Sequence, residues 1–128
     1  MQPITHAEQP TEPWRPDVMT RMLVSAAMGA RQLCQFEQWS APGAGAPTHH
    51  HAVEEIVTIL AGQAEFWLDG QTTALAAGQS LIVPAGHPHG FRNSGTTKLH
   101  TLATLAAPIF EAAYEDARET PRRWTPRE

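Results

Sequence analysis

The segment from Gly43 to Gly62 reads GAGAPTHHHAVEEIVTILAG and carries three consecutive histidines followed by two glutamates. In an extended strand alternate side chains share one face, so His49, His51 and Glu55 point to the same side of this segment. Histidines at positions i and i+2 lie about 6.5 to 7 Å apart at their Cα atoms, which lets both rings reach one ion. Glu55 has the parity and spacing of a third ligand, whereas its rival Glu54 points to the other face. By itself the pattern allows two interpretations, a metal site and a solvated polar stretch.

A second segment, from Gly78 to Asn93, reads GQSLIVPAGHPHGFRN and adds a further histidine at position 89. Together the two segments resemble the cupin superfamily, whose signatures are G-x5-H-x-H-x3-E-x6-G and G-x5-P-x-G-x2-H-x3-N. Every fixed position of both signatures is present in this chain. The 15 residues between the two segments are similar to the spacing in compact, single-domain members of that superfamily.

The resemblance implies an all-β fold, namely a cupin-type β jelly-roll barrel that holds one divalent transition metal per chain. Position by position, it implies the metal ligands His49, His51, Glu55 and His89. Three neutral imidazoles and one carboxylate would leave a divalent ion with a net charge of about +1 and with open coordination positions. Ligands of this kind accept most first-row divalent ions, so the metal is open among Fe, Mn, Ni, Cu and Zn. The resemblance assigns no catalytic residue beyond this metal centre.

Short β-like runs punctuated by glycine and proline surround the two signature segments. Asp69 and Gly70 lie between two of these runs and predict a hairpin, because a type I′ turn needs positive φ at both central residues. The predicted strands are Met19–Ala27, Arg31–Trp39, Glu55–Leu60, Ala64–Leu68, Thr72–Ala76, Leu81–Val83, Gly90–Arg92 and Lys98–Leu105. Many short strands at this spacing indicate an antiparallel sandwich or barrel.

Three parts are predicted along the chain: an extended, Pro-rich N-terminal arm over residues 1–18, a barrel domain over 19–107, and a short C-terminal helix and tail over 108–128. Prolines exclude regular helix from the arm, which we expect to pair with a sheet edge of its own chain or of a partner. After Pro108, which suits a first helical turn, apolar residues recur at three- and four-residue spacings and predict the helix. These residues are Ile109, Phe110, Ala113, Tyr114 and Ala117.

The other histidines are expected outside the metal site. His50 has the wrong strand parity, and His87 fits the surface or the rim of the barrel better than a place behind the ligands. His100 either lines the cavity or is simply hydrogen-bonded on its strand. His6 lies in the N-terminal arm and carries no functional signal.

The strand predicted over residues 31–39 leaves the cavity wall undecided. One face of this strand carries Cys34, Phe36 and Gln38, and the other carries Leu33, Gln35, Glu37 and Trp39. Strand parity separates the two sets but does not say which set faces inward. A mainly apolar pocket with one polar, metal-bearing end would suit a small, partly hydrophobic ligand that carries oxygen.

Composition limits the function classes. The 128 residues are 41% hydrophobic and 17% charged, which predicts one globular domain. A net charge of −4 argues against nucleic acid as a partner, and no apolar run approaches the roughly 20 residues that a membrane-spanning helix requires. The single cysteine carries no mark of an oxidising compartment, so we expect a cytoplasmic protein. The expected partners are a small-molecule ligand or substrate and, by family resemblance, a second copy of the chain in a homodimer.

Three hypotheses for the function follow from the implied metal centre. The first is a metal-dependent dioxygenase that acts on a small oxygen-bearing organic substrate. The second is a non-redox isomerase, decarboxylase or lyase of a small acid or sugar, in which the metal stabilises an enolate-like charge. The third is a non-catalytic module that binds a metal or a small ligand. Lys98 is the only lysine, which argues against a sugar phosphate as the substrate.

Overall fold

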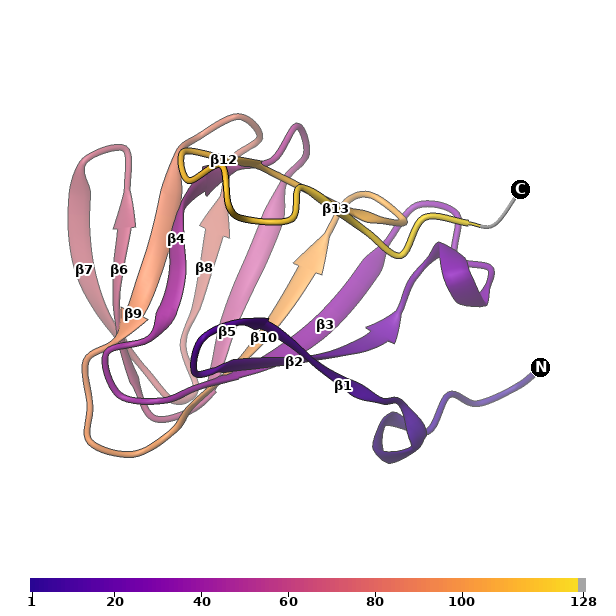
Figure 1. Ribbon diagram of the computed structural model, residues 1–128, viewed down its shortest axis with the longest axis horizontal. Coiled ribbons are helices and arrows are strands. Elements are labelled where there is room, and N and C mark those ends of the chain that lie inside the picture. The colour runs from indigo at the N-terminus through magenta and orange to yellow at the C-terminus, as the bar shows by residue number, and fades with distance from the viewer. Residues whose placement is uncertain (127–128) are drawn as a thin grey trace.

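The computed structural model describes residues 1–126 and shows two antiparallel sheets that face each other to form a barrel (Figure 1). The larger sheet has the order β1 (Thr11–Arg15), β2 (Val18–Val24), β3 (Cys34–Ser40), β10 (Leu99–Leu105), β5 (Glu55–Ala61) and β8 (Ser80–Val83). The smaller sheet has the order β12 (Ala113–Tyr114), β4 (Gly45–His50), β9 (His89–Asn93), β6 (Gln63–Leu68) and β7 (Gln71–Ala76). The all-β barrel predicted from the sequence is confirmed.

Four short elements complete the described chain. The strand β11 (Phe110–Glu111) pairs with β13 (Arg122–Arg123) to form a small third sheet. Two short 3-10 helices, η1 (His6–Glu8) and η2 (Ala26–Met28), lie before β1 and after β2. Serine 25 caps η2, since its hydroxyl accepts a hydrogen bond from the amide of Ala27.

The core forms between the two sheets because buried and more exposed residues alternate along the strands. In β10 the residues Leu99, Thr101, Ala103 and Leu105 are buried, and those between them are only half-buried. This strand pairs with β3 on one side and with β5 on the other, so it lies inside the larger sheet. Its inward face therefore meets the smaller sheet across the barrel.

The turn between β6 and β7 has the backbone that its sequence predicts. Asp69 and Gly70 have φ angles of 52° and 79°, and the flanking residues Leu68 and Gln71 pair across the hairpin. Gly62 also has a positive φ of 89°, and a Cβ atom there would lie 2.8 Å from the carbonyl oxygen of Lys98. Only glycine fits both the conformation and the space at position 62.

The N-terminal arm pairs with the chain's own sheet. Residues Thr11–Arg15 form β1 and run antiparallel to β2, with Asp17 at a φ of 63° in the turn between them. The sequence leaves open whether the arm pairs with a sheet edge of its own chain or of a partner, and the structure shows it paired with its own chain. Arg15, the last residue of β1, lines a cavity inside the barrel.

The predicted C-terminal helix is wrong. Residues Phe110–Tyr114 are extended, with Phe110 and Ala112 buried and Glu111 and Ala113 exposed. This is a period of two, whereas the helix was predicted from three- and four-residue spacings that small alanines satisfy as easily as large residues. Pairing of β12 with β4 and of β11 with β13 supplies backbone hydrogen bonds that a helix would have made locally.

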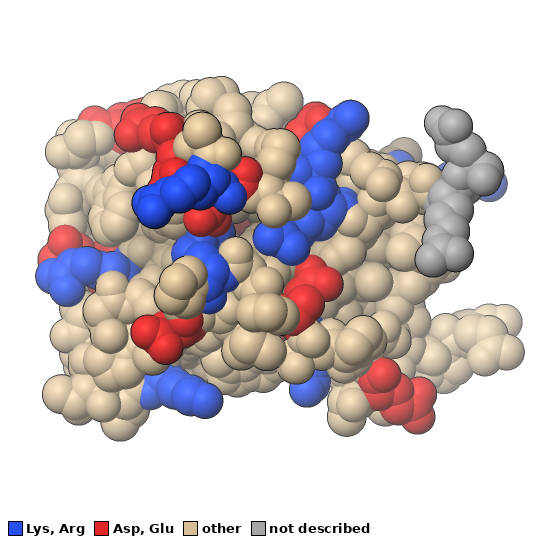
Figure 2. Space-filling model, in the orientation of Figure 1, with Lys and Arg blue, Asp and Glu red and all other residues tan. Residues whose placement is uncertain are grey.

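On the face shown in Figure 2, lysine and arginine side chains are interspersed with aspartate and glutamate. Several of these charges form ion pairs, such as that between Arg92 and Glu65 at 3.1 Å. Within residues 1–126, no helix has the length and apolar character needed to cross a membrane.

Candidate metal centre

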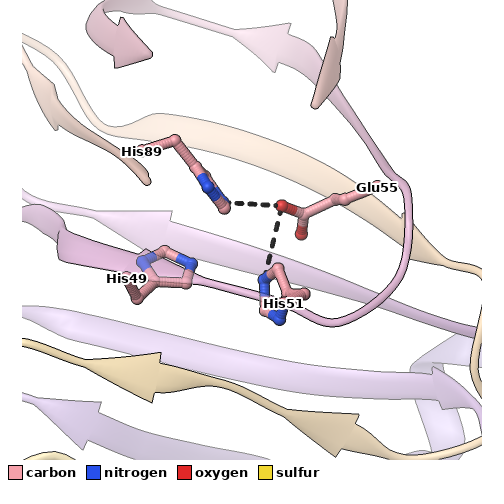
Figure 3. A group of neighbouring side chains, drawn as sticks. All are labelled: His49, His51, Glu55 and His89. Carbon is pink, nitrogen blue, oxygen red and sulfur yellow. Dashed lines mark hydrogen bonds and ion pairs between the residues drawn. The ribbon is translucent and has the colours of Figure 1, made fainter. Parts of the chain in front are cut away.

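Four side chains meet inside the barrel: His49, His51, Glu55 and His89 (Figure 3). His49 lies on β4 opposite His89, the first residue of β9, and Glu55 is the first residue of β5. Between β4 and β5 the chain turns, which carries Glu55 from the smaller sheet to the larger one. The candidate ligand atoms all lie within 4.8 Å of one another, and each residue is at most 6% exposed.

The structure separates these residues from their sequence neighbours as strand parity predicts. His50 and Glu54 are exposed, whereas His51 and Glu55 are buried in the cluster. The alternation carries past the end of β4, so His49 and His51 still point to the same side.

Backbone carbonyl groups fix the orientation of all three imidazoles. The Nδ1 atoms of His49, His51 and His89 lie 2.7, 2.7 and 2.9 Å from the carbonyl oxygens of Pro47, Glu111 and His87 respectively. A carbonyl oxygen only accepts hydrogen bonds, so each Nδ1 carries the proton and donates it. Each Nε2 atom is therefore left as the nitrogen that faces the cluster, which is the arrangement that metal-binding histidines use.

The donor set fits a divalent transition metal. Glu55 Oε1 lies 3.0 Å from Nε2 of His89 and 3.5 Å from Nε2 of His51, and the longer contact is too long for a good hydrogen bond. His51 Nε2 is therefore a buried nitrogen without a hydrogen-bond partner. A buried polar atom of this kind is costly unless something binds it, and a cation among the four residues would do so.

Burial and mutual contact set the charges in the cluster. Burial, together with the neighbouring His89 and His51, lowers the pKa of His49 to about 3, so this ring is neutral and free to act as a ligand. Burial raises the pKa of Glu55, but its close contacts with His51 and His89 and their attraction outweigh that effect and lower the pKa to about 2. Burial alone would lower the pKa of His51, yet the contact with Glu55 raises it. Glu55 is thus the negative member of the set.

A small enclosed cavity of about 20 Å³ adjoins the cluster, which is room for about one water molecule. Phe36 and Gln38 line it, whereas Trp39 lies on the outer side of the sheet. The structure therefore decides the orientation of β3, which strand parity leaves open. The other lining residues from the barrel strands are Ala46, Val57, Phe91, Thr101 and Ala103.

Residues at both ends of the chain also line this cavity, and the sequence gives no local signal for them. Trp14 and Arg15 come from β1, and Phe110 and Tyr114 come from the C-terminal segment. The ring of Tyr114 packs 5.0 Å from that of His49, because β12 pairs with β4 and places the two residues opposite each other. Only this long-range pairing brings Tyr114 to the site.

The remaining histidines lie away from the cluster. His87 is exposed and forms an ion pair with Asp69, although its carbonyl oxygen supports His89. His100 stacks on Trp39 and bonds to Glu37 at 2.8 Å on the outer side of the larger sheet. Of the two alternatives for His100, the structure shows the hydrogen-bonded one. His6 lies in η1 and is exposed.

The signature residue Asn93 has a structural role. Its amide nitrogen donates to the carbonyl oxygens of Ser40 and Thr97, at 2.9 and 2.7 Å. Its amide oxygen accepts a hydrogen bond from the backbone N–H of Gly95. Asn93 thus joins β9 to the end of β3 and to the following loop.

A barrel of two antiparallel sheets that buries three histidines and one glutamate defines a class of small β-barrel proteins with a candidate metal centre. The family model for the cupin domain, Cupin_2, matches residues 38–105, which include all four residues of the cluster. The chain belongs to the Cupin_2 family.

Two curated proteins resemble parts of the chain. Polyketide synthase CurC of Streptomyces cyaneus is 42% identical over 90 residues, which cover 70% of this chain and 56% of CurC. Dimethylsulfoniopropionate lyase DddQ of Ruegeria pomeroyi is 47% identical over 47 residues, which cover 36% of this chain and 23% of DddQ. The chain thus spans less than two thirds of the length of either relative.

The fold resembles that of solved structures along most of its length. The polyketide cyclase RemF of Streptomyces resistomycificus matches with a TM-score of 0.75 at 21% sequence identity. The match covers 91% of this chain and 86% of RemF. At this identity the likeness shows the fold alone.

Proposed function

We propose that this protein is a metal-dependent enzyme that carries out non-redox chemistry, of the lyase, decarboxylase, cyclase or isomerase type, on a small oxygen-bearing organic compound. The observation that carries the proposal is the set of three imidazoles whose Nδ1 atoms are held by backbone carbonyls while their Nε2 atoms face Glu55. Rings fixed in this way are prepared for ligation before any ligand arrives.

The names of the relatives favour non-redox chemistry over oxygenase chemistry. DddQ is named as a lyase and CurC as a polyketide synthase, and neither name describes an oxygenase. The dioxygenase hypothesis that the sequence also allows gains no support from these relatives. Elimination and ring closure both pass through carbanion- or enolate-like charge, so one kind of site can serve both.

His49, His51, Glu55 and His89 would hold the ion, and a divalent ion there would polarise a bound oxygen atom and stabilise negative charge on it. Around it, the aromatic rings of Phe36, Phe91 and Phe110 form an apolar part of the cavity wall. The side chains of Gln38 and Thr101 line the same cavity and offer hydrogen bonds to a polar ligand. This chain's own contribution is therefore an oriented site with apolar walls and one polar end.

Turnover with and without dioxygen tests the proposal. The protein, reconstituted separately with Zn²⁺, Mn²⁺, Ni²⁺ and Fe²⁺, is incubated with dimethylsulfoniopropionate, small β-keto acids and linear polyketide mimics. We expect product from at least one compound at equal rates in air and under nitrogen. His89→Ala should abolish that product and His50→Ala should retain it. Turnover that requires and consumes dioxygen would contradict the proposal in favour of an oxygenase.

The non-catalytic module is the second candidate, because the cavity of about 20 Å³ is too small for a substrate unless part of the wall moves. Metal-dependent binding of the same compounds, with no product in any metal form, would replace the enzyme proposal by this one. Isothermal titration on the same preparations distinguishes the two outcomes.

A further inference from the structure

Two chain segments that lie outside the part matched by the family model contact each other. One is β1, and the other is the C-terminal segment from Phe110 to Arg123, which runs past β12 to β13 in yellow in Figure 1. They are joined by Arg15, whose Nε and Nη2 atoms lie 2.7 and 2.6 Å from Oε1 of Glu119. Both of these charged side chains are only 11% exposed.

The guanidinium of Arg15 also contacts a residue that packs against the candidate metal centre. Its Nη2 atom donates to the hydroxyl of Tyr114 at 3.3 Å, and the ring of Tyr114 packs on His49. Arg15 lines the same cavity as His49, Glu55 and His89, and no other arginine or lysine of the described chain lines it. Arg15 is thus the one positive side chain that lines the cavity within the described chain, and the ring of Tyr114 lies between its guanidinium and His49.

Arg15 also forms part of the partition between this cavity and the solvent. An open groove of about 590 Å³ outside the barrel shares Trp14, Arg15, Ala46 and Phe91 with the enclosed cavity. Glu119 lines the groove but not the cavity. The side chain of Arg15 therefore has solvent and Glu119 on one side and the metal centre on the other.

We infer that Arg15 binds a carboxylate group of the substrate and that Glu119 holds the same guanidinium when no substrate is present. The inference rests on the proposed function and adds the class of substrate, a small carboxylic acid whose reacting oxygen lies at the metal. A charge argument supports it. A divalent ion with three neutral imidazoles and Glu55 carries about +1, and Arg15 released from Glu119 adds a second positive charge. An anionic compound is the ligand that this pair of charges attracts.

If the carboxylate of the substrate replaces that of Glu119, the charge on Arg15 stays paired throughout. Glu119 lies in the connection between β12 and β13, outside either strand. The backbone turns there, and the amide of Glu119 donates a hydrogen bond to the carbonyl oxygen of Asp116. Arg15 also donates from Nη1 to the carbonyl oxygen of Gly45 at 3.0 Å, a bond within the barrel that does not depend on Glu119. The guanidinium can therefore stay in place while the Glu119 segment leaves and the cavity opens to the groove.

Two catechols that differ only in charge at one end test the inference on the Zn²⁺-loaded protein. The probes are 3,4-dihydroxybenzoate and 4-methylcatechol, whose shared diol reaches the metal and whose para groups are a carboxylate and a methyl. We expect 3,4-dihydroxybenzoate to bind about 10-fold more tightly than 4-methylcatechol, as measured by isothermal titration. Arg15→Gln should remove that preference. Glu119→Gln should increase it by a further ~10-fold, since the competing carboxylate is gone.

The gain in Glu119→Gln keeps the test decisive, because a variant that merely folds poorly cannot bind a ligand more tightly. Arg122→Gln is the matched control on the same segment, since the Arg122 side chain is 63% exposed and lines neither the cavity nor the groove, so its change should leave both affinities as they are. Equal affinities for the two probes in the native protein, or equal losses for both probes in Glu119→Gln, would overturn the inference and show that Arg15 and Glu119 only join the two segments. Probe binding that does not need Zn²⁺ would instead contradict the proposed function.

Discussion

Each imidazole of the candidate metal centre is oriented by a backbone carbonyl, and these carbonyls differ in how far away they lie in the sequence. Pro47 and His87 each precede the histidine that they hold by two residues, so strand geometry alone supplies them. The carbonyl that holds His51 belongs to Glu111, which is 60 residues away. The orientation of His51 therefore depends on the C-terminal segment, although the presence of His51 in the site follows from local parity.

Folding changes the acidity of the Cys34 thiol. It lies on β3 with no exposed surface, and burial, together with the charge of Glu55, raises the pKa of its thiol from 9.0 to about 12. The native thiol stays protonated where the unfolded one ionises, so its contribution to stability is present below pH 9.0 and is lost as the pH rises toward 12.

We expect Cys34 to react with iodoacetamide at pH 8 at least about 100-fold more slowly in the native protein than in urea, because the thiolate is the reactive form. Mass spectrometry of timed samples measures the rate, and as the chain has one cysteine a single mass increment reports it. Similar rates in both conditions would contradict the buried position of Cys34.

At the scale of elements, the C-terminal segment is where sequence and structure disagree. The helix was inferred from five apolar residues, but two of them, Ala113 and Ala117, are exposed in the structure. Alanine is small enough to be buried or exposed at little cost, so it defines a period poorly. The large residues Phe110 and Trp124 decide the position of the segment, since both pack against Trp14 and Phe36.

Glutamate substitutions at two neighbouring alanines distinguish the extended segment from a helix. Ala112 is 5% exposed and lies in the aromatic cluster, so Ala112→Glu buries a charge and should lower the free energy of unfolding by more than about 2 kcal/mol. Ala113 is exposed, and Ala113→Glu should change the free energy of unfolding by no more than about 0.5 kcal/mol. Urea denaturation of both variants measures the difference. The reverse order of effects would support the helix.

At the scale of the whole molecule, the four candidate ligands connect the two sheets. His49 and His89 belong to strands of the smaller sheet, and Glu55 belongs to the larger one. An ion bound to all of them would join the sheets at the end of the barrel where the C-terminal segment also packs. Binding to the folded state alone stabilises a protein by about 2.7 kcal/mol when free ligand exceeds its dissociation constant 100-fold.

Zn²⁺ at that excess should raise the midpoint of thermal unfolding by about 5 to 15 °C and should bind at about one ion per chain. His51→Ala should abolish both effects, because it removes a buried donor from the cluster. His50→Ala should keep both, because His50 is exposed. Differential scanning calorimetry and elemental analysis measure the two quantities. Equal loss of zinc in the two variants would refute the assignment by strand parity.

The sequence by itself determined the barrel, the hairpin at Asp69–Gly70 and the four residues of the cluster. These features depend on patterns over a few residues, such as alternation along a strand, positive φ in a turn and fixed intervals within each signature segment. Short-range geometry is set by neighbours in the chain, so it can be read from the order of residues.

Only the tertiary structure decided which face of β3 lines the cavity, that residues 110–114 are extended, and that Arg15, Tyr114 and Glu119 meet beside the candidate metal centre. Each of these depends on pairing or packing between segments far apart in the chain. Arg15 and Glu119 are 104 residues apart, and no local pattern records that contact. The pairing of β1 with β2 and of β12 with β4 brings the two segments to one end of the barrel, and burial there then selects which charges must pair.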